Sequence, residues 1–156
     1  MRRLEVCSFA VFAGVLFLSG PSALAAPPES PLERSAEQAL AARQKMMQEH
    51  ASAAEVDAFL TFFTDNVIYE DPVVNMRLEG KDTIRKGMNG FLGATRNARI
   101  TVTGRLSAAN VVVLGQTVSF DSRDEGQPWK PQSRHQLTVF EFDGTKIRRI
   151  ADYWAR

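Results

Sequence analysis

Apolar residues recur at intervals of three and four over three stretches of the chain, a pattern typical of amphipathic helices. The first stretch covers residues 35–50, with Ser35 as a candidate N-cap. The second covers residues 53–66 and ends at Asn66, and the third covers residues 80–95. The pattern therefore predicts three helices, the third weakened by its internal glycines.

A different pattern, with a period of two, follows these helices. A short strand is predicted at residues 67–71. Four longer strands are predicted in runs rich in β-branched and aromatic residues, at 98–107, 110–123, 133–143 and 146–156. Helices followed by a meandering antiparallel sheet indicate the α+β class. Wrapped around three N-terminal helices, a curved sheet forms a cone whose inward-facing side chains can enclose a pocket.

The N-terminus has the pattern of a signal peptide. Arg2 and Arg3 precede the apolar run 6–20, and small residues then indicate a signal peptide over residues 1–25 with cleavage before Ala26. The run is shorter than the roughly 20 residues that cross a bilayer, although an uncleaved anchor stays open as an alternative. We therefore expect a periplasmic or secreted protein that has no membrane contact after cleavage.

The mature chain is expected to be one domain without thiols. Its only cysteine, Cys7, lies inside the predicted signal peptide, so neither a disulfide nor a thiolate metal ligand is expected after cleavage. Residues 26–34 are predicted to be a flexible leader and residues 35–156 a folded domain. A domain of this length buries about two thirds of its unfolded surface, and one core therefore suffices.

Charge and motif content exclude several classes of partner. The formal charge of +1 is spread along the chain in mixed signs, so neither nucleic acid nor an anionic membrane surface is predicted as a partner. Histidines and carboxylates show no metal-ligand spacing, and no phosphate-binding glycine motif occurs. We therefore predict no metal site and no cofactor. His135 is expected on the outer face of its strand, and His50 at the end of the first helix.

Several motifs carry a resemblance to a known superfamily. These are "FFTDNVIYEDP" leading to "EGKDTIRKG", then "GQTVSF" in a long strand, "FEFDGTKI", and "DYW" in the last strand. Their order over residues 36–156 resembles the nuclear transport factor 2-like superfamily, in particular SnoaL-like proteins and ketosteroid isomerases. The resemblance implies a cystatin-like α+β roll. It is weakly specific for a reaction, because this fold hosts enzymes and non-enzymes.

The "EDP" stretch carries the first candidate catalytic residue. In ketosteroid isomerases the acid of this stretch is the general base that moves a proton across the steroid, and the resemblance implies that role for Asp71. The residues alone leave a second interpretation open, in which Asp71 ends a strand by bonding a nearby backbone amide and Pro72 stiffens the turn.

The same resemblance implies two oxyanion donors that this chain lacks. Met47 stands at the place of the family's helical tyrosine, and Thr138 at the place of its protonated acid. A thioether cannot donate a hydrogen bond and a hydroxyl donates weakly, so efficient steroid isomerisation is not expected unless another group substitutes.

A second candidate acid lies on the last strand. Alternation places Ile150, Asp152 and Trp154 on one face. SnoaL-like cyclases use an inward-facing acid for proton transfer, and the resemblance implies that role for Asp152. The alternative from the residues alone is a surface carboxylate that pairs with Arg134 or Arg149.

The predicted pocket wall is apolar with a few polar tips. Its expected ligand-binding residues are Phe63, Tyr69, Met88, Gln116, Val118, Phe120, Thr138 and Trp154. Such a lining suits a small aromatic, terpenoid or polyketide-like molecule, although each aromatic residue is also compatible with ordinary core packing.

Two functions and one assembly state follow from these patterns. The first function is a cofactor-free isomerase or cyclase that transfers protons on a small apolar molecule. The second is a non-catalytic module that binds a ligand or serves for dimerisation. An apolar stripe on the outer face of the sheet predicts a homodimer, as the resemblance also implies; it consists of Val111, Val113, Leu137 and Val139.

Overall fold

The computed structural model describes residues 30–124 and 126–155, which form helices first and long strands afterwards. The expected signal peptide and its cleavage point lie outside these residues. In chain order the elements are α1 (Pro31–Met46), α2 (Ala53–Leu60), β1 (Phe63–Asp71), the 3-10 helix η1 (Pro72–Val74), β2 (Met76–Glu79), α3 (Lys81–Asn89), β3 (Thr95–Ala108), β4 (Val111–Ser122), β5 (Lys130–Asp143) and β6 (Lys146–Trp154).

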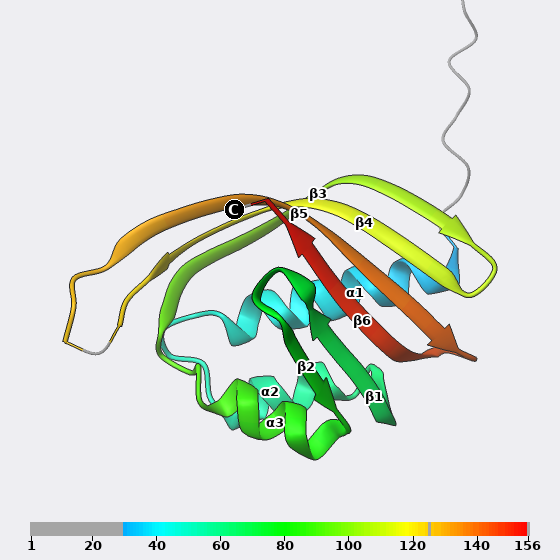
Figure 1. Cartoon of the computed structure of the whole chain (residues 1–156), viewed down its shortest axis with the longest axis horizontal. Coiled ribbons are helices and arrows are strands. Elements are labelled where there is room, and N and C mark those ends of the chain that lie inside the picture. The colour runs from blue at the N-terminus through cyan, green and yellow to red at the C-terminus, as the bar shows by residue number, and fades with distance from the viewer. Residues whose placement is uncertain (1–29, 125, 156) are drawn as a thin grey trace, which may run out of the picture.

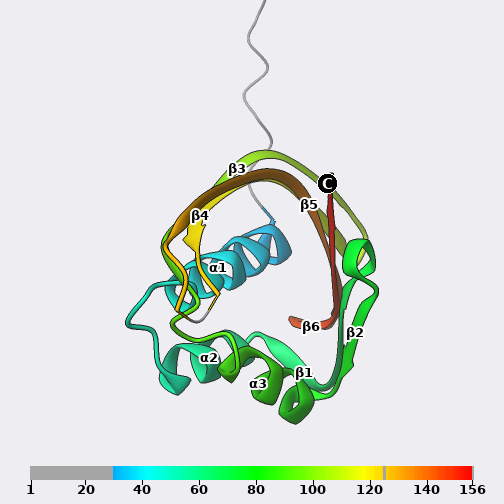
Figure 2. The ribbon, with the colours of Figure 1, turned by 60° about the vertical axis from the view of Figure 1, so that its left-hand side comes forward.

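The strands form one curved sheet over the helices. Its order is β2-β1-β6-β5-β4-β3, and every neighbouring pair is antiparallel except β1 with β6, which is parallel. The long strands β3, β4 and β5 arch across α1, while α2 and α3 lie near β1 at the open side of the curve (Figures 1 and 2). The predicted α+β cone is therefore confirmed. The parallel pair was not predicted. It forms because β1 joins the sheet beside β6, the last strand, and runs in the same direction.

The first helix begins earlier than the sequence pattern predicted. The Ser30 side chain accepts a hydrogen bond from the Glu33 amide at 3.1 Å, and the Glu33 carboxylate accepts one from the Ser30 amide at 2.8 Å. This reciprocal cap, with Pro31 at the first helical position, fixes the start of α1. Residues 31–34 are therefore helical, and the predicted cap at Ser35 was wrong.

The second helix ends earlier than predicted. After Leu60 the chain turns, and residues 63–66 belong to β1, where Phe63 pairs with Ile147 of β6. Phe63 had fitted the helical spacing, but pairing with a strand that is distant in sequence decides its conformation. Strand β2 was also not predicted, and it pairs with the end of β1.

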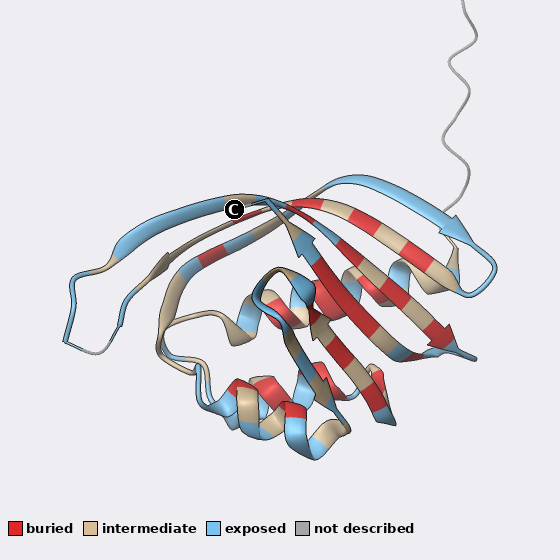
Figure 3. Ribbon diagram, in the orientation of Figure 1, coloured by how far each residue is buried: buried red, intermediate tan, exposed pale blue. Residues whose placement is uncertain are grey.

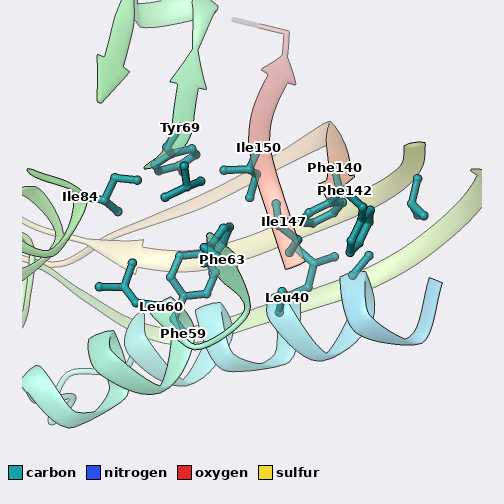
Figure 4. Close-up of a cluster of buried hydrophobic side chains, with 14 of the residues drawn as sticks. Leu40, Phe59, Leu60, Phe63, Tyr69, Ile84, Phe140, Phe142, Ile147 and Ile150 are labelled. Carbon is teal, nitrogen blue, oxygen red and sulfur yellow. The ribbon is translucent and has the colours of Figure 1, made fainter. Parts of the chain in front are cut away.

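The buried face of the sheet changes character along the strands. At one end Phe140, Phe142, Ile147 and Ile150 pack against α1 and α2, together with Phe59 and Phe63, whose rings meet edge to face at 4.7 Å (Figure 4). At the other end the inward-facing residues of the same strands are polar, namely Gln116, Gln136, Thr138 and Asp152. Figure 3 shows the alternating burial along these strands.

The apolar end supplies the stability on which the polar end depends. Burying one large apolar side chain contributes about 1.5–3 kcal/mol, whereas a buried polar group stabilises only when it is hydrogen-bonded.

Within the described ranges, no helix combines the length and the hydropathy that crossing a membrane requires.

Candidate functional site

A cavity of about 340 Å³ opens beside the polar end of the sheet. It is bounded by α1, β1, η1, β2 and α3, and by single residues of β3, β4 and β5. Most of its wall is apolar and flexible, with Met46, Met47, Val74, Met76, Leu78, Met88, Phe91 and Phe120. Its polar groups are Arg43, Tyr69, Asp71, Thr95 and Arg134. Methionine side chains adapt to irregular shapes, so this wall suits an apolar molecule.

A wider, open depression lies on the outer side of the sheet, around Gly115, His135, Leu137 and Tyr153. No carboxylate or arginine of the described residues lines it. The inner cavity, by contrast, is lined by one carboxylate and two arginines, Asp71, Arg43 and Arg134.

Asp71 combines the two roles that the sequence left open. It lies in the cavity wall at the end of β1 and is 9% exposed. Its Oδ1 accepts a hydrogen bond from the Val73 amide at 3.2 Å, which caps the turn η1. Its Oδ2 accepts one from the indole Nε1 of Trp154 at 3.0 Å. The residue is thus a strand-ending turn acid whose second oxygen is held at the cavity by an aromatic donor.

Asp152 lies behind the cavity wall at the centre of a buried network. Its Oδ1 accepts hydrogen bonds from Gln136 Nε2 and Thr138 Oγ1, both at 2.7 Å. Its Oδ2 accepts one from the Tyr69 hydroxyl at 2.8 Å and lies 2.8 Å from Arg43 Nη1. Asp152 is 1% exposed and is not among the residues lining the cavity. The alternative of a surface carboxylate was therefore wrong.

The predicted partners of Asp152 were wrong as well. Arg149 pairs with Glu70 and Glu141 on the outer side of the sheet, and Arg134 faces the cavity. Arg43, the actual partner, comes from α1. It is buried, at 8% exposure, on the same helical face as Ala36, Ala39 and Leu40.

The network fixes the protonation of two groups that line the cavity. Burial by itself would lower the pKa of Arg43, but attraction to Asp152, with smaller contributions from Tyr69 and Asp71, raises that pKa overall. Burial also raises the pKa of Tyr69, so its hydroxyl stays protonated and donates to Asp152. The cavity therefore borders a guanidinium that stays charged and a phenol that stays neutral.

Arg134 is held differently. Its guanidinium lies 4.6 Å from the ring centre of Trp154 and 5.7 Å from that of Phe120. Burial, followed by repulsion from Arg43, lowers the pKa of Arg134. Stacking on two aromatic rings orients the group without neutralising its charge.

The residues expected at the oxyanion donor positions occupy different surroundings. Met47 lines the cavity, where its thioether supplies no donor. Thr138 is fully buried; its hydroxyl accepts from Gln116 Nε2 at 2.6 Å and donates to Asp152. Arg43 and Arg134 are the cationic groups at the cavity, and the sequence analysis assigned neither of them to it.

The expected ligand-binding residues divide into two groups. Tyr69, Met88 and Phe120 line the cavity. The others lie elsewhere: Phe63 is in the apolar core, Gln116 and Thr138 are in the buried network, Val118 is buried, and Trp154 contacts Asp71 and Arg134 without being part of the cavity wall.

Neither histidine reaches the cavity. His135 is exposed on the outer face, where its Nδ1 lies 3.2 Å from Thr117 Oγ1, and His50 is exposed after α1. Within residues 30–124 and 126–155, no group of three or more His, Cys, Asp and Glu side chains is placed to hold a metal ion.

Comparisons with known proteins agree with this architecture. The model of a SnoaL-like domain family matches residues 44–150. A search of curated protein sequences finds no match to this chain.

Solved structures show the same fold at low sequence identity. An NTF2-like protein from Anabaena variabilis is 14% identical, with a TM-score of 0.64 over 85% of this chain and 96% of that one. An LEH-like epoxide hydrolase from M. tuberculosis is 20% identical, with a TM-score of 0.58 over 78% and 84% of the two chains. A ketosteroid isomerase-like protein from Catenulispora acidiphila, in complex with trimethylamine, is 18% identical, with a TM-score of 0.58 over 76% and 85%.

Proposed function

Because this chain belongs to the SnoaL-like domain family, we propose that it binds a small, mainly apolar molecule in the cavity and transfers a proton on it, with Asp71 as the base and without a cofactor. The observation that carries this proposal is the placement of the Asp71 carboxylate in a mainly apolar wall that also contains Arg43. Fold alone does not define a reaction, so the proposal rests on the side chains of the site.

These side chains suit proton abstraction from a carbon atom next to a carbonyl group. Asp71 takes the proton, and the electron pair of the broken C–H bond moves to the carbonyl oxygen as an enolate. Arg43, which Asp152 keeps charged and in place, faces the cavity and stabilises the negative oxygen. In a ligand with a β,γ carbon–carbon double bond the electron pair spreads over a dienolate, so Asp71 can return the proton to the γ carbon and the double bond moves into conjugation with the carbonyl, which completes an isomerisation. In this scheme Arg43 substitutes for the donors that Met47 and Thr138 do not supply.

A non-catalytic binding module is the second candidate. It is favoured by the hydrogen bonds that both Asp71 oxygens already make, to the Val73 amide and to Trp154. A role in binding leaves both of these bonds in place. The trimethylamine bound by the protein from Catenulispora acidiphila also fits a small-ligand site without requiring a reaction.

Deuterium exchange separates the two candidates. The protein is incubated in D₂O with 2-indanone, an apolar ketone with exchangeable C–H groups, and exchange is followed by NMR. We expect accelerated exchange in the native chain and a loss of at least about a hundredfold in Asp71→Asn. Asp143→Asn, which alters an exposed acid at the end of β5, should leave the rate unchanged. Saturable ketone binding without accelerated exchange would favour the binding module.

The expected export and dimerisation complete the proposal. Export rests on the N-terminal pattern of residues 1–25. Dimerisation rests on the outer sheet face, where the exposed side chains of Leu137 and Tyr153 lie next to the half-buried Val113 and Val139. Covering this apolar surface with a second copy of the chain would remove it from water.

A further inference from the structure

Among the described residues, Arg134 differs from Arg43, the other arginine of the cavity wall, because it makes no ion pair with a carboxylate. An ion pair of 4.0 Å or less joins a carboxylate to each of Arg43, Arg77, Arg85, Arg96, Arg105, Arg123, Arg148 and Arg149. Among the described residues Arg134 has no such pair, and its buried Nε has no hydrogen-bond partner. Burying a donor of a charged group without a hydrogen bond costs free energy. A partner from outside the chain that accepts this hydrogen bond would remove that cost.

The surroundings of Arg134 restrict its position in the cavity wall. The side chain is half-buried in the cavity wall, and the rings of Trp154 and Phe120 restrict its orientation. Asp71, the carboxylate in the same wall, accepts its hydrogen bonds from Trp154 and the Val73 amide instead. Burial and then repulsion from Arg43 lower the pKa of Arg134, and attraction to Asp152 and Asp71 offsets only part of this; a bound anion would act in the same direction as these carboxylates.

We propose that the ligand of this cavity has an apolar body and one anionic oxygen group, and that Arg134 binds this group. A carboxylate suits a guanidinium best, because its two oxygens match the two parallel N–H donors of the planar fork. The apolar body fits the wall that includes Met76, Met88 and Phe120. The inference rests on the proposed function only in that the cavity binds a small molecule, and it assigns the substrate to the class of apolar organic acids.

The ligand class defines a role for each cationic group. Arg43 is paired with Asp152 and stays available to stabilise charge that develops during a reaction. Arg134 instead binds charge that the ligand carries from the start, so it orients the molecule against Asp71 and weakens the binding of neutral analogues. A site built for a charged group rejects analogues that lack it, since the buried cation then stays unpaired.

Two fluorescent dyes test this inference directly. Anilinonaphthalene sulfonate and N-phenyl-1-naphthylamine share an aromatic body, but only the first carries an anionic group. In fluorescence titrations we expect the native protein to bind the anionic dye at least about tenfold more tightly, the size of one charge-assisted hydrogen bond. 4-Phenylbutyrate should displace the bound dye at lower concentration than its neutral amide, 4-phenylbutyramide.

Variants of Arg134 test whether this side chain causes the preference for the anionic dye. Arg134→Gln should abolish the preference for the anionic dye while binding the neutral dye as before, which also shows that the cavity is intact. Arg134→Lys should keep part of the preference, because it keeps the charge but loses the fork. Arg99→Gln is the matched control, since Arg99 is exposed on strand β3 of the same sheet and does not line the cavity.

The outcomes separate this inference from the proposed function. Equal affinities of the two dyes for the native protein, or a preference that survives in Arg134→Gln, would overturn the inference and leave the binding cavity and the role of Asp71 in place. Saturable binding of neither dye would overturn the inference together with the proposed binding function. The deuterium-exchange assay with Asp71→Asn uses a neutral ketone, so its result tests the role of Asp71 independently of the anion preference of Arg134.

Discussion

Replacing Asp152 by Asn should be among the most destabilising single changes in this chain. The substitution conserves shape, so it creates no cavity, but it removes the negative charge opposite the buried Arg43. It also places an amide nitrogen in the network. Whichever way the amide is oriented, that nitrogen faces an N–H donor: Arg43 at the Oδ2 position, or Gln136 Nε2 at the Oδ1 position.

The magnitude follows from the burial of Arg43. Breaking a buried ion pair by removing one partner costs about 3–5 kcal/mol, because the remaining charge stays desolvated without compensation. Domains of this size have a total stability of about 5–15 kcal/mol, so the variant should lose a large fraction of it. The melting temperature should fall by roughly 10–20 °C.

Urea denaturation followed by circular dichroism measures this loss, with Asp143→Asn as the control for an exposed acid of the same type. A double variant, Arg43→Met with Asp152→Asn, should regain about 1 kcal/mol or more relative to the sum of the single changes, because the unpaired charge is gone. A loss below about 1 kcal/mol in Asp152→Asn, or strict additivity in the double variant, would refute the idea that a buried ion pair holds this end of the sheet.

Three further predictions concern other parts of the molecule. Hydrogen bonds from Arg149 and Arg77 lower the pKa of Glu70, so Glu70 contributes stability above its unfolded pKa of about 4.3 that is lost as pH falls through its folded pKa. Glu70→Gln should therefore reduce stability by about 1 kcal/mol at pH 7 and flatten the acid dependence in urea titrations between roughly pH 6 and 3; an unchanged pH profile would contradict this. Leu137→Glu should convert a dimer into a monomer by light scattering at micromolar concentration, whereas a native protein that is already monomeric would speak against the outer-face interface. N-terminal sequencing of exported protein should find Ala26 first, and retention of Met1 in a soluble cytoplasmic fraction would exclude cleavage.

The long strands were predictable because their side chains carry a local signal. β-Branched and aromatic residues alternate through β4 and β5, and the inward face predicted for Gln116 and Thr138 is the face that the structure buries. The boundaries near residues 60–66 were not predictable in the same way. Phe63 satisfies both the helical spacing and the strand alternation, and only its pairing with Ile147, far along the chain, decides between them.

Asp71 was found through the resemblance of its "EDP" stretch to that of ketosteroid isomerases, whereas the strand end and the following proline alone predicted only a strand-ending turn acid. Arg43 and Arg134 were missed although a signal existed for each. Arg43 lies at helical spacing from Ala36 and Ala39, and Arg134 has the same strand parity as Thr138. The expectation that charged residues lie at the surface outweighed both patterns.

The alternation of residues along a strand can place an arginine on the inner face, but it does not show whether a carboxylate lies beside it. Asp152 on β6 meets Arg43 from α1 and Tyr69 from β1, and these three elements are distant in sequence. Because Asp152 pairs with Arg43, and Asp71 accepts its hydrogen bonds from Trp154 and the Val73 amide, Arg134 faces the cavity without an ion pair to a described carboxylate. The specificity proposed for this site therefore arises from the way its inward-facing charges are paired, because Arg43 has an ion-pair partner and Arg134 has none among the described residues. This pairing becomes visible only when the partners are placed in three dimensions, since each residue taken alone is compatible with an ordinary surface charge.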